Sequence, residues 1–195
     1  MPIEDMGDGS SSRMRLRDRR RDLLFVVAFS VFAFTSLVME IHPTFGIDLR
    51  HATDPFGRVL HFYASSFDPL FLDPPLYLRV MTGIDLFVFG PFYLVAIYAL
   101  VKEREWIRLP GIAYVSAIVY STVVYFSVEF LGERSRAELV WVTIINVPYV
   151  VVPLMFAWRL RAPTLFPTER AQRVAVNADR AEPGPLVDAA VRPGG

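Results

Sequence analysis

The sequence predicts an all-α membrane protein, a bundle of four transmembrane helices with a long loop between the first two. Three observations support this class. Hydrophobic residues make up 53% of the 195 residues, which is high for a soluble protein of this size. Four apolar segments reach, or nearly reach, the ~20 residues that cross a bilayer core. Basic residues gather at one side of those segments, as the positive-inside rule requires.

The four segments are residues 23–40, 76–101, 111–131 and 139–160. Six arginines between positions 13 and 21 precede the first segment. No A-x-A-like cleavage site follows that segment, so we expect a retained helix and not a signal peptide. Basic residues also join the second and third segments and follow the fourth, at Lys102, Arg104, Arg108, Arg159 and Arg161.

This charge pattern places both termini in the cytoplasm of a multi-pass integral membrane protein. The membrane would be the plasma membrane in a bacterium and the endoplasmic reticulum in a eukaryote. The 41–75 connection, with four aspartates, is then extracytoplasmic or lumenal. Its stretch VLHFYASSFDPLFLDPP sets aromatic residues between turn signals, so we expect it to fold over the mouth of the bundle.

The chain divides into three parts by composition. Residues 1–22 form a basic N-terminus that we expect to be disordered and cytoplasmic. Residues 23–163 form the four-span membrane domain. Residues 164–195, rich in Ala, Arg, Pro and Gly, form a second disordered cytoplasmic tail.

Acidic residues in or near the spans need an explanation, because a charge in mid-membrane costs ~2.5–3.5 kcal/mol on insertion scales. Asp85 lies ~14 Å along the second span at 1.5 Å per residue, too deep to reach the headgroups. Glu40 and Glu129 lie at the outer ends of their spans, where reaching the interface is an equally good interpretation. With Asn146 of the fourth span, these residues share the outer half of the bundle, so we predict that they converge on one site. A hydrogen-bond network that only holds the helices together is the alternative.

Proline and aromatic residues favour a pocket there. Pro91, Pro148 and Pro153 each remove a backbone hydrogen bond from a span and open space between helices. Tyr149 lies three residues after Asn146 on the same helix face, where its ring could stabilise a cation. Two further tyrosines of the third span are candidates for substrate binding, although most aromatic residues are expected in the core or the interfacial belt. They are Tyr120 and Tyr125.

Several classes of function find no support. Without cysteine there is no disulfide framework and no thiol nucleophile. His42, His51 and His61 lack the i, i+4 spacing of a helical metal site, so we expect no metal. We find no nucleotide loop or Ser/His/Asp arrangement, expect no cofactor, and attribute the basic clusters to membrane topology and not to nucleic-acid binding.

Five stretches together resemble one known family. They are SLVMEI at the end of the first span, FDPLFLDPP in the loop, FGPFYLVAIYALVKEREWIRLPGIAY across the second and third spans, VVYFSVEF in the third, and NVPYVVVPLMFAWRLRAP in the fourth. Their order and spacing are similar to the EXPERA domain, which emopamil-binding protein, a sterol Δ8-Δ7 isomerase, shares with the sigma-2 receptor. The resemblance runs from about residue 23 to residue 163.

The isomerase branch implies a catalytic site. There an H-x-x-x-E pair, a later Glu and an N-x-x-W pair surround the sterol. Glu40, Glu129 and Asn146 match the two acids and the amide, but Ser36 stands in place of the histidine and Tyr149 in place of the tryptophan. The missing histidine puts Δ8-Δ7 isomerisation itself in doubt. The receptor branch implies a binding site instead, in which acids that match Glu40, Asp68 and Asp85 bind an amine, hold the loop and line the pocket.

Two functions therefore compete. The first is an isomerase or cyclase of a sterol or other isoprenoid, in which Glu40 or Glu129 protonates an alkene, the other acid acts as base, and Asn146 and Tyr149 stabilise the carbocation. Asp85 is a third candidate catalytic acid, and Ser36 is a candidate for substrate binding. The second is a non-catalytic sterol- or lipid-binding or transport protein. We favour the first because an amine site needs only one carboxylate. A third interpretation, docking to another membrane protein, has no specific support. The expected partners are a hydrophobic small molecule and the bilayer, and a homodimer is left open.

Overall fold

The computed structural model describes residues 19–132 and 137–166. Within these ranges every element is helical, and four helices are long and apolar enough to cross a membrane. The predicted fold class is confirmed. These helices are Arg20–Phe45, Leu76–Val101, Glu105–Leu131 and Leu139–Leu160. The disorder predicted at the two ends of the chain falls mainly on residues 1–18 and 167–195, which lie outside the described residues.

The first two membrane helices each contain a π-helical turn, in which backbone hydrogen bonds span five residues. The first consists of α1 (Arg20–Phe34), the π-helical η2 (Thr35–Met39) and α2 (Ile41–Phe45). The second consists of α4 (Leu76–Ile84), the π-helical η5 (Asp85–Phe89) and α5 (Gly90–Val101). The first helix continues past its predicted end at residue 40 because its stop signal is Gly46, whose φ of 64° is the left-handed conformation that glycine adopts without strain.

The third and fourth membrane helices each consist of two consecutive segments. The third is a short turn, η6 (Glu105–Ile107), continued by α6 (Arg108–Leu131). The fourth is α7 (Leu139–Asn146) and α8 (Pro148–Leu160). It is interrupted at Val147, directly before a proline that has no N–H to donate. The loop holds three short helices, η3 (Leu49–His51), α3 (Pro55–Ser66) and η4 (Pro69–Phe71).

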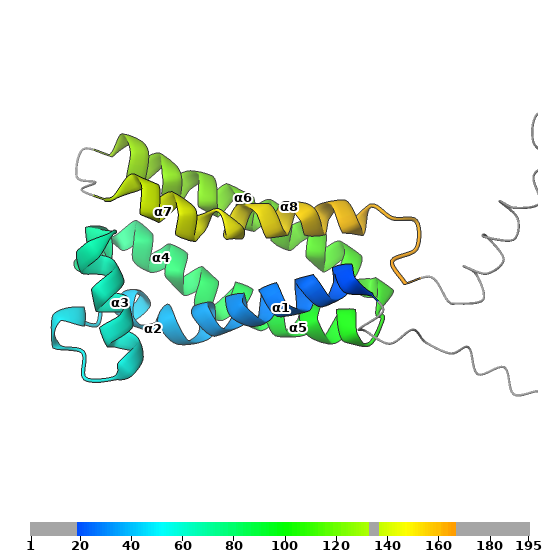
Figure 1. Ribbon diagram of the computed structural model, residues 1–195, viewed down its shortest axis with the longest axis horizontal. Coiled ribbons are helices and arrows are strands. Elements are labelled where there is room, and N and C mark those ends of the chain that lie inside the picture. The colour runs from blue at the N-terminus through cyan, green and yellow to red at the C-terminus, as the bar shows by residue number, and fades with distance from the viewer. Residues whose placement is uncertain (1–18, 133–136, 167–195) are drawn as a thin grey trace, which may run out of the picture.

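The helices form two layers (Figure 1). One layer contains α1, α4 and α5, and the other contains α6, α7 and α8. The two described chain ends, at Arg19 and Phe166, lie at one end of the bundle, and α3 lies across the opposite end. No more than 39% of the most apolar stretch of any of the four helices is buried in the protein. The remaining apolar surface is suited to lipid, so the chain is a multi-pass integral membrane protein.

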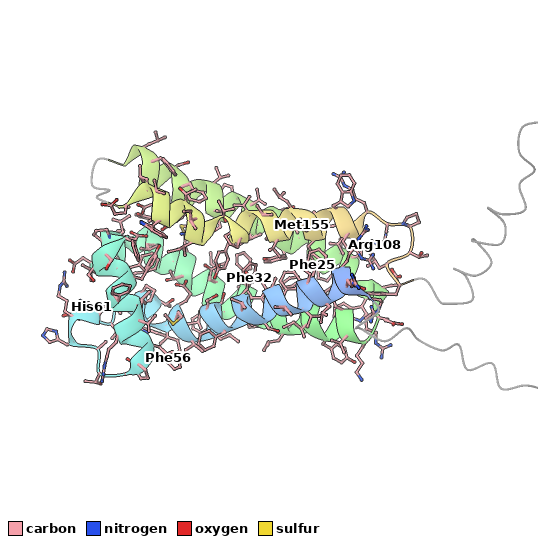
Figure 2. All side chains as sticks on the ribbon, viewed as in Figure 1. Phe25, Phe32, Phe56, His61, Arg108 and Met155 are labelled. Carbon is pink, nitrogen blue, oxygen red and sulfur yellow. The ribbon has the colours of Figure 1, made fainter. Side chains whose placement is uncertain are left out.

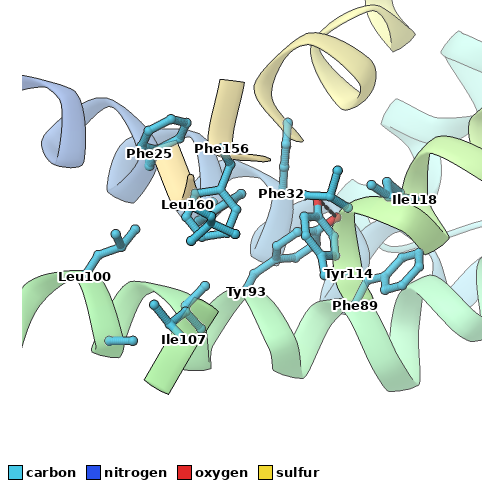
Figure 3. Packing of buried hydrophobic residues seen from close by; sticks show 14 of the residues in the cluster. Phe25, Phe32, Phe89, Tyr93, Leu100, Ile107, Tyr114, Ile118, Phe156 and Leu160 are labelled. Atoms are coloured by element: carbon cyan, nitrogen blue, oxygen red, sulfur yellow. Dashed lines mark hydrogen bonds between the residues drawn. The ribbon is translucent and has the colours of Figure 1, made fainter. Parts of the chain in front are cut away.

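Aromatic rings fill the half of the bundle nearest the described chain ends (Figure 3). Phe29 on α1 is fully buried, and its ring centroid lies 5.0 Å from that of Phe156 on α8 and 5.7 Å from that of Tyr93 on α5. Tyr114 on α6 stacks on Phe92 with 4.4 Å between centroids. Such ring pairs contribute ~0.5–1.5 kcal/mol each beyond their burial. The interior of this half is therefore packed.

A buried carboxylate joins the first and last membrane helices at the same end. Asp22 is 2% exposed and accepts hydrogen bonds from Arg19 Nη1 at 2.9 Å and from Arg159 Nε at 3.1 Å. Arg159 also donates to the carbonyl oxygen of Leu165, and the N–H of Leu165 donates to Glu105 Oε1 at 2.7 Å. The segment that follows α8 is thus held against both α1 and η6.

Asp68 fixes the long loop to the third membrane helix. Its side chain is fully buried, where Oδ2 accepts from the Tyr125 hydroxyl at 2.5 Å and Oδ1 from the N–H of Leu70 at 3.2 Å. Burial raises the pKa of the Asp68 carboxyl above its usual range, and the two hydrogen bonds oppose that shift without cancelling it. The neighbouring Phe67 carbonyl accepts from the N–H of Glu138 at 2.8 Å, which ties the loop to the start of the fourth helix as well.

We expect the stability that Asp68 contributes to depend on pH. Because its folded-state pKa is raised above the unfolded value, its contribution is fully present below the unfolded pKa, about 3.9 for Asp, and is lost as the pH rises through the folded pKa. The Tm of the wild type minus that of Asp68→Asn should therefore fall as the pH rises from about 4 towards neutrality. Thermal unfolding in detergent micelles measures this difference.

Asp73 supplies a control of opposite sign. Its hydrogen bond from Arg50, with Nη2 2.7 Å from Oδ2, lowers the pKa of this exposed carboxyl. The Tm of the wild type minus that of Asp73→Asn should therefore rise as the pH is raised towards the unfolded pKa, about 3.9 for Asp, and change little above it. If the two Tm differences change with pH in the same direction, the pKa shifts assigned to Asp68 and Asp73 are contradicted.

Candidate functional site

A cavity of about 290 Å³ occupies the half of the bundle next to α3. This volume is at the lower end of the ~300–1,000 Å³ typical of small-molecule sites. The polar side chains in its wall are Thr35, Glu40, Tyr63, Thr82, Asp85, Ser121, Thr122, Tyr125, Asn146 and Tyr149. The apolar ones are Met39, Val59, Leu60, Phe71, Leu78, Met81, Ile118 and Ile145. All four membrane helices and α3 thus contribute to one chamber.

Glu40 reaches this chamber from the end of η2. Its N–H donates to the carbonyl oxygen of Thr35 at 3.2 Å, the five-residue spacing of a π-helix. That wider turn shifts the register, so residues beyond it do not continue the 3.6-residue spacing of α1. The Glu40 Oε2 atom is shielded from solvent and has no hydrogen-bond partner among the described residues.

Asp85 enters the same chamber from the first position of η5. The N–H of Gly90 donates to the carbonyl oxygen of Asp85, again across five residues, and Pro91 follows without an N–H of its own. Asp85 Oδ1 is also shielded and without a hydrogen-bond partner in the described part of the chain. The two carboxyl groups are close enough to repel each other if both are ionised. The chamber wall therefore contains two carboxyl groups, each with one oxygen that has no hydrogen-bond partner among the described residues.

Gly90 allows the two π-helical turns to pack closely. A Cβ atom at position 90 would lie 2.6 Å from Leu37 Cδ2 of η2 and 2.9 Å from Leu37 Cγ. Both distances are shorter than carbon atoms tolerate. The absent side chain therefore permits the approach that sets Glu40 and Asp85 on one wall.

Tyr149 stands on the opposite layer and contacts η2. Its hydroxyl lies 2.8 Å from Thr35 Oγ1, and that Thr hydroxyl donates its only proton to the Phe32 carbonyl oxygen at 3.0 Å. Tyr149 is therefore the donor in the first of these bonds. One face of its ring stacks on Phe32 with 4.3 Å between centroids, which leaves only the other face for a ligand.

A second polar group lies where the loop meets α6 and α7. The Tyr63 hydroxyl on α3 lies beside Tyr125 and Asn146, and burial, with a smaller effect from Asp68, raises the pKa of Tyr63 to about 12. Tyr63 therefore keeps its proton near neutral pH and remains a hydrogen-bond donor. The Asn146 amide donates from Nδ2 to the Val142 carbonyl oxygen at 2.8 Å.

Three of the predicted catalytic and substrate-binding residues do not line the chamber. Ser36 is buried beside it but does not line it. Tyr120 is 73% exposed on the outer surface of α6. Glu129 is buried, one helical turn beyond Tyr125, and its charge acts on Tyr63 and Tyr77 without lining the chamber. The acids that share the chamber are thus Glu40 and Asp85.

Comparison with known proteins identifies the family. The model of the EXPERA family (EXPanded EBP superfamily) matches residues 55–160, which is more than half of the chain. The chain belongs to the EXPERA family. Sigma intracellular receptor 2 of Macaca fascicularis is 31% identical over 124 residues, which cover 55% of this chain and 70% of the relative. Its counterpart in Homo sapiens is 30% identical over the same coverage. The family match begins after Glu40, so the place of Glu40 in this EXPERA protein rests on geometry.

Sequence reasoning missed several hydroxyl groups of this EXPERA chamber. Thr82 lies three residues before Asp85, and Thr122 lies three before Tyr125, so helical spacing from those predicted residues would have found both. Thr35 and Tyr63 carried no such signal. Thr35 lies across the π-helical turn from Glu40, and Tyr63 comes from a loop helix distant in sequence from its neighbours.

We expect Gly90→Ala to destabilise the EXPERA bundle by ~1–3 kcal/mol, because the new methyl group overpacks against Leu37. In a Leu37→Ala background the same change should stabilise it by up to ~1 kcal/mol, since alanine is the better helix former. Unfolding in detergent of the four proteins of this double-mutant cycle measures the difference.

Gly83→Ala is the matched control, because its Cβ would lie 3.6 Å from Thr44 Cγ2, an ordinary contact. It should be neutral or stabilising in both backgrounds. Equal effects of Gly90→Ala with and without Leu37 would show that the two π-helical turns do not pack as described.

Proposed function

We propose that this EXPERA protein binds a hydrophobic small molecule of the sterol or isoprenoid class inside the membrane. Glu40 and Asp85 hold an ammonium or hydroxyl group of that molecule, and the apolar wall of the chamber encloses its hydrocarbon part. The observation that carries the proposal is that the carboxyl groups of Glu40 and Asp85 line one mainly apolar chamber, and that one oxygen of each has no protein partner in the described residues.

Physical chemistry favours a cationic or hydroxyl-bearing ligand. A buried carboxyl group without a hydrogen-bond partner has an uncompensated desolvation cost. Each of two such groups side by side has this desolvation cost. An ammonium group between them would offset it for both. A hydroxyl group would donate to one oxygen and accept from a protonated neighbour. The two relatives are named as receptors, which is consistent with binding.

We propose that the ligand approaches the chamber from the bilayer. Val59 on α3 and Ile145 on α7 line it, yet they are 58% and 40% exposed on the outer surface. A ligand dissolved in the lipid could enter beside these exposed side chains without crossing water. We also propose that both termini are cytoplasmic, because the end of the bundle near Arg19 and Phe166 carries the basic clusters.

Replacing either acid should weaken binding of a cationic amphiphile by about 10- to 100-fold, since a hydrogen bond to a charged group contributes ~1.5–3 kcal/mol. Titration of Glu40→Gln and Asp85→Asn protein in nanodiscs with a sterol-like amine measures this loss. Asp48→Asn removes an exposed loop carboxyl, with Oδ1 at 3.5 Å from Arg50 Nη1, and is the matched control. It should bind within about twofold of the wild type. Unchanged affinity in both acid variants would refute the proposed site.

The second candidate function is an isomerase or cyclase, and one observation favours it. Asp85 shares the chamber wall with Glu40 and replaces Glu129 as the second acid of the pair. One carboxyl group would protonate an isoprenoid alkene carbon, giving a tertiary carbocation. The other carboxylate would then remove a proton from a neighbouring carbon, leaving a shifted double bond or a closed ring. The free face of Tyr149 would stabilise the cation.

The catalytic function predicts a product whose formation needs both acids. Membranes that contain the wild type should convert a sterol or polyprenyl substrate, with deuterium from solvent incorporated at the protonated carbon. Glu40→Gln and Asp85→Asn should each reduce turnover by at least ~100-fold, because general acid and base steps contribute 10²–10⁴-fold. Glu129→Gln should retain turnover, since its carboxyl lies outside the chamber. Binding without any product or deuterium exchange would reject catalysis and leave the binding function in place.

A further inference from the structure

A second hollow lies on the outer surface of the bundle, away from the chamber. It is a groove of about 540 Å³ between the first turns of α1 and the last turns of α8. Leu24 from α1, with Leu154, Met155 and Trp158 from α8, line its apolar part. Figure 2 shows Phe25 and Met155 on the facing helices in this half of the bundle. The groove is therefore at the end of the bundle where the described chain begins and ends.

The apolar wall of the groove faces the surroundings and not the core. Leu24, Leu154 and Met155 are 47%, 50% and 46% exposed. Trp158 at the rim is 75% exposed, a position typical of the aromatic belt at the membrane–water interface. The groove thus runs from the interface into the hydrocarbon region, in the direction that an acyl chain takes.

Positive charge lies at the interfacial end of the groove. Arg21 and Arg159 both line it. Arg159 shares Asp22 with Arg19, and Arg19 also contacts Glu103 with 3.3 Å between Nη2 and Oε1. The charges of Arg19 and Arg159 are therefore balanced by two acidic residues.

Arg21 is exposed and, among residues 19–132 and 137–166, has no ion pair or hydrogen bond from its side chain. Its charge is uncompensated. The groove therefore combines a free cation at the interface with an apolar trough below it.

We propose that this groove binds one anionic phospholipid. The phosphate and acidic headgroup pair with Arg21, with Arg159 beside them, and one acyl chain lies along Leu24, Leu154 and Met155. An anionic lipid is the occupant that matches both features, because a zwitterionic lipid covers the apolar wall but leaves the charge of Arg21 without a net counterion. Basic pockets between membrane helices bind anionic headgroups by the same physics.

The test uses the tryptophan at the rim of the groove. The chain has three tryptophans, so the double substitution Trp106→Phe and Trp141→Phe leaves Trp158 as the reporter. The full-length protein is reconstituted in vesicles that contain phosphatidylcholine and phosphatidylglycerol, with brominated acyl chains on one lipid at a time. Quenching of Trp158 then gives the relative affinity of the groove for the two lipids.

We expect phosphatidylglycerol to be preferred over phosphatidylcholine by about fivefold, since one basic residue near anionic lipid contributes about that factor. Arg21→Gln should reduce the preference to about one. Arg20→Gln removes the same charge from the adjacent exposed residue, which does not line the groove, and should change the preference by less than twofold. Glu40→Gln should leave it unchanged, which separates this site from the chamber.

Three outcomes would overturn the proposal. Equal quenching by the two brominated lipids in the wild type would show that the groove does not select charge. If Arg20→Gln and Arg21→Gln reduce the preference for phosphatidylglycerol equally, the preference arises from the surface potential of this whole end of the bundle. Failure of either lipid to quench Trp158, together with a dimer in native mass spectrometry that Leu154→Trp disrupts, would assign the groove to a second copy of the chain.

Discussion

The carboxyl groups of Glu40 and Asp85 impose the constraint on which this bundle depends. A carboxyl group among apolar helices needs a partner, because its lost hydration is not otherwise offset. The chain places the two on facing helices, each beside a π-helical turn. Such turns are rare and occur often at functional sites. Their presence beside both acids indicates that the position of the acids, and not the regularity of the helices, governs this part of the fold.

The bundle is divided between a packed half and a hollow half. Interlocking rings around Phe29 make the first rigid, and a rigid support is what keeps a ligand chamber open without ligand. The hollow half is completed by the loop, which Asp68 fastens to Tyr125. Since Tyr125 also lines the chamber, the same contact that holds the loop positions one side of the site.

The membrane helices could be predicted from sequence because length and apolar composition suffice to define a span. The depth of a residue in the membrane could be predicted too, and Asp85 and Asn146 do lie in the chamber wall. The rotation of each helix about its own axis, which decides which residues face the chamber, could not be predicted from the sequence. The π-helical turns break the 3.6-residue spacing on which rotation arguments depend, and Glu129 lies just one turn past the wall. Tyr63 belongs to a loop helix, and its contact with Asn146 arises only from the tertiary fold.

The Asp22 ion pair has a consequence for biogenesis. Its partner Arg159 is near the end of the last membrane helix, so the ribosome makes it after the first three helices have been synthesised. Until then Arg19 is the only one of the two arginines that can balance this carboxylate. The contact between Asp22 and the fourth helix is therefore made only when that helix is in place. Closure of this end of the bundle thus waits for the last helix to be made, and a chain that ends before Arg159 lacks the ion pair that joins its first and fourth helices.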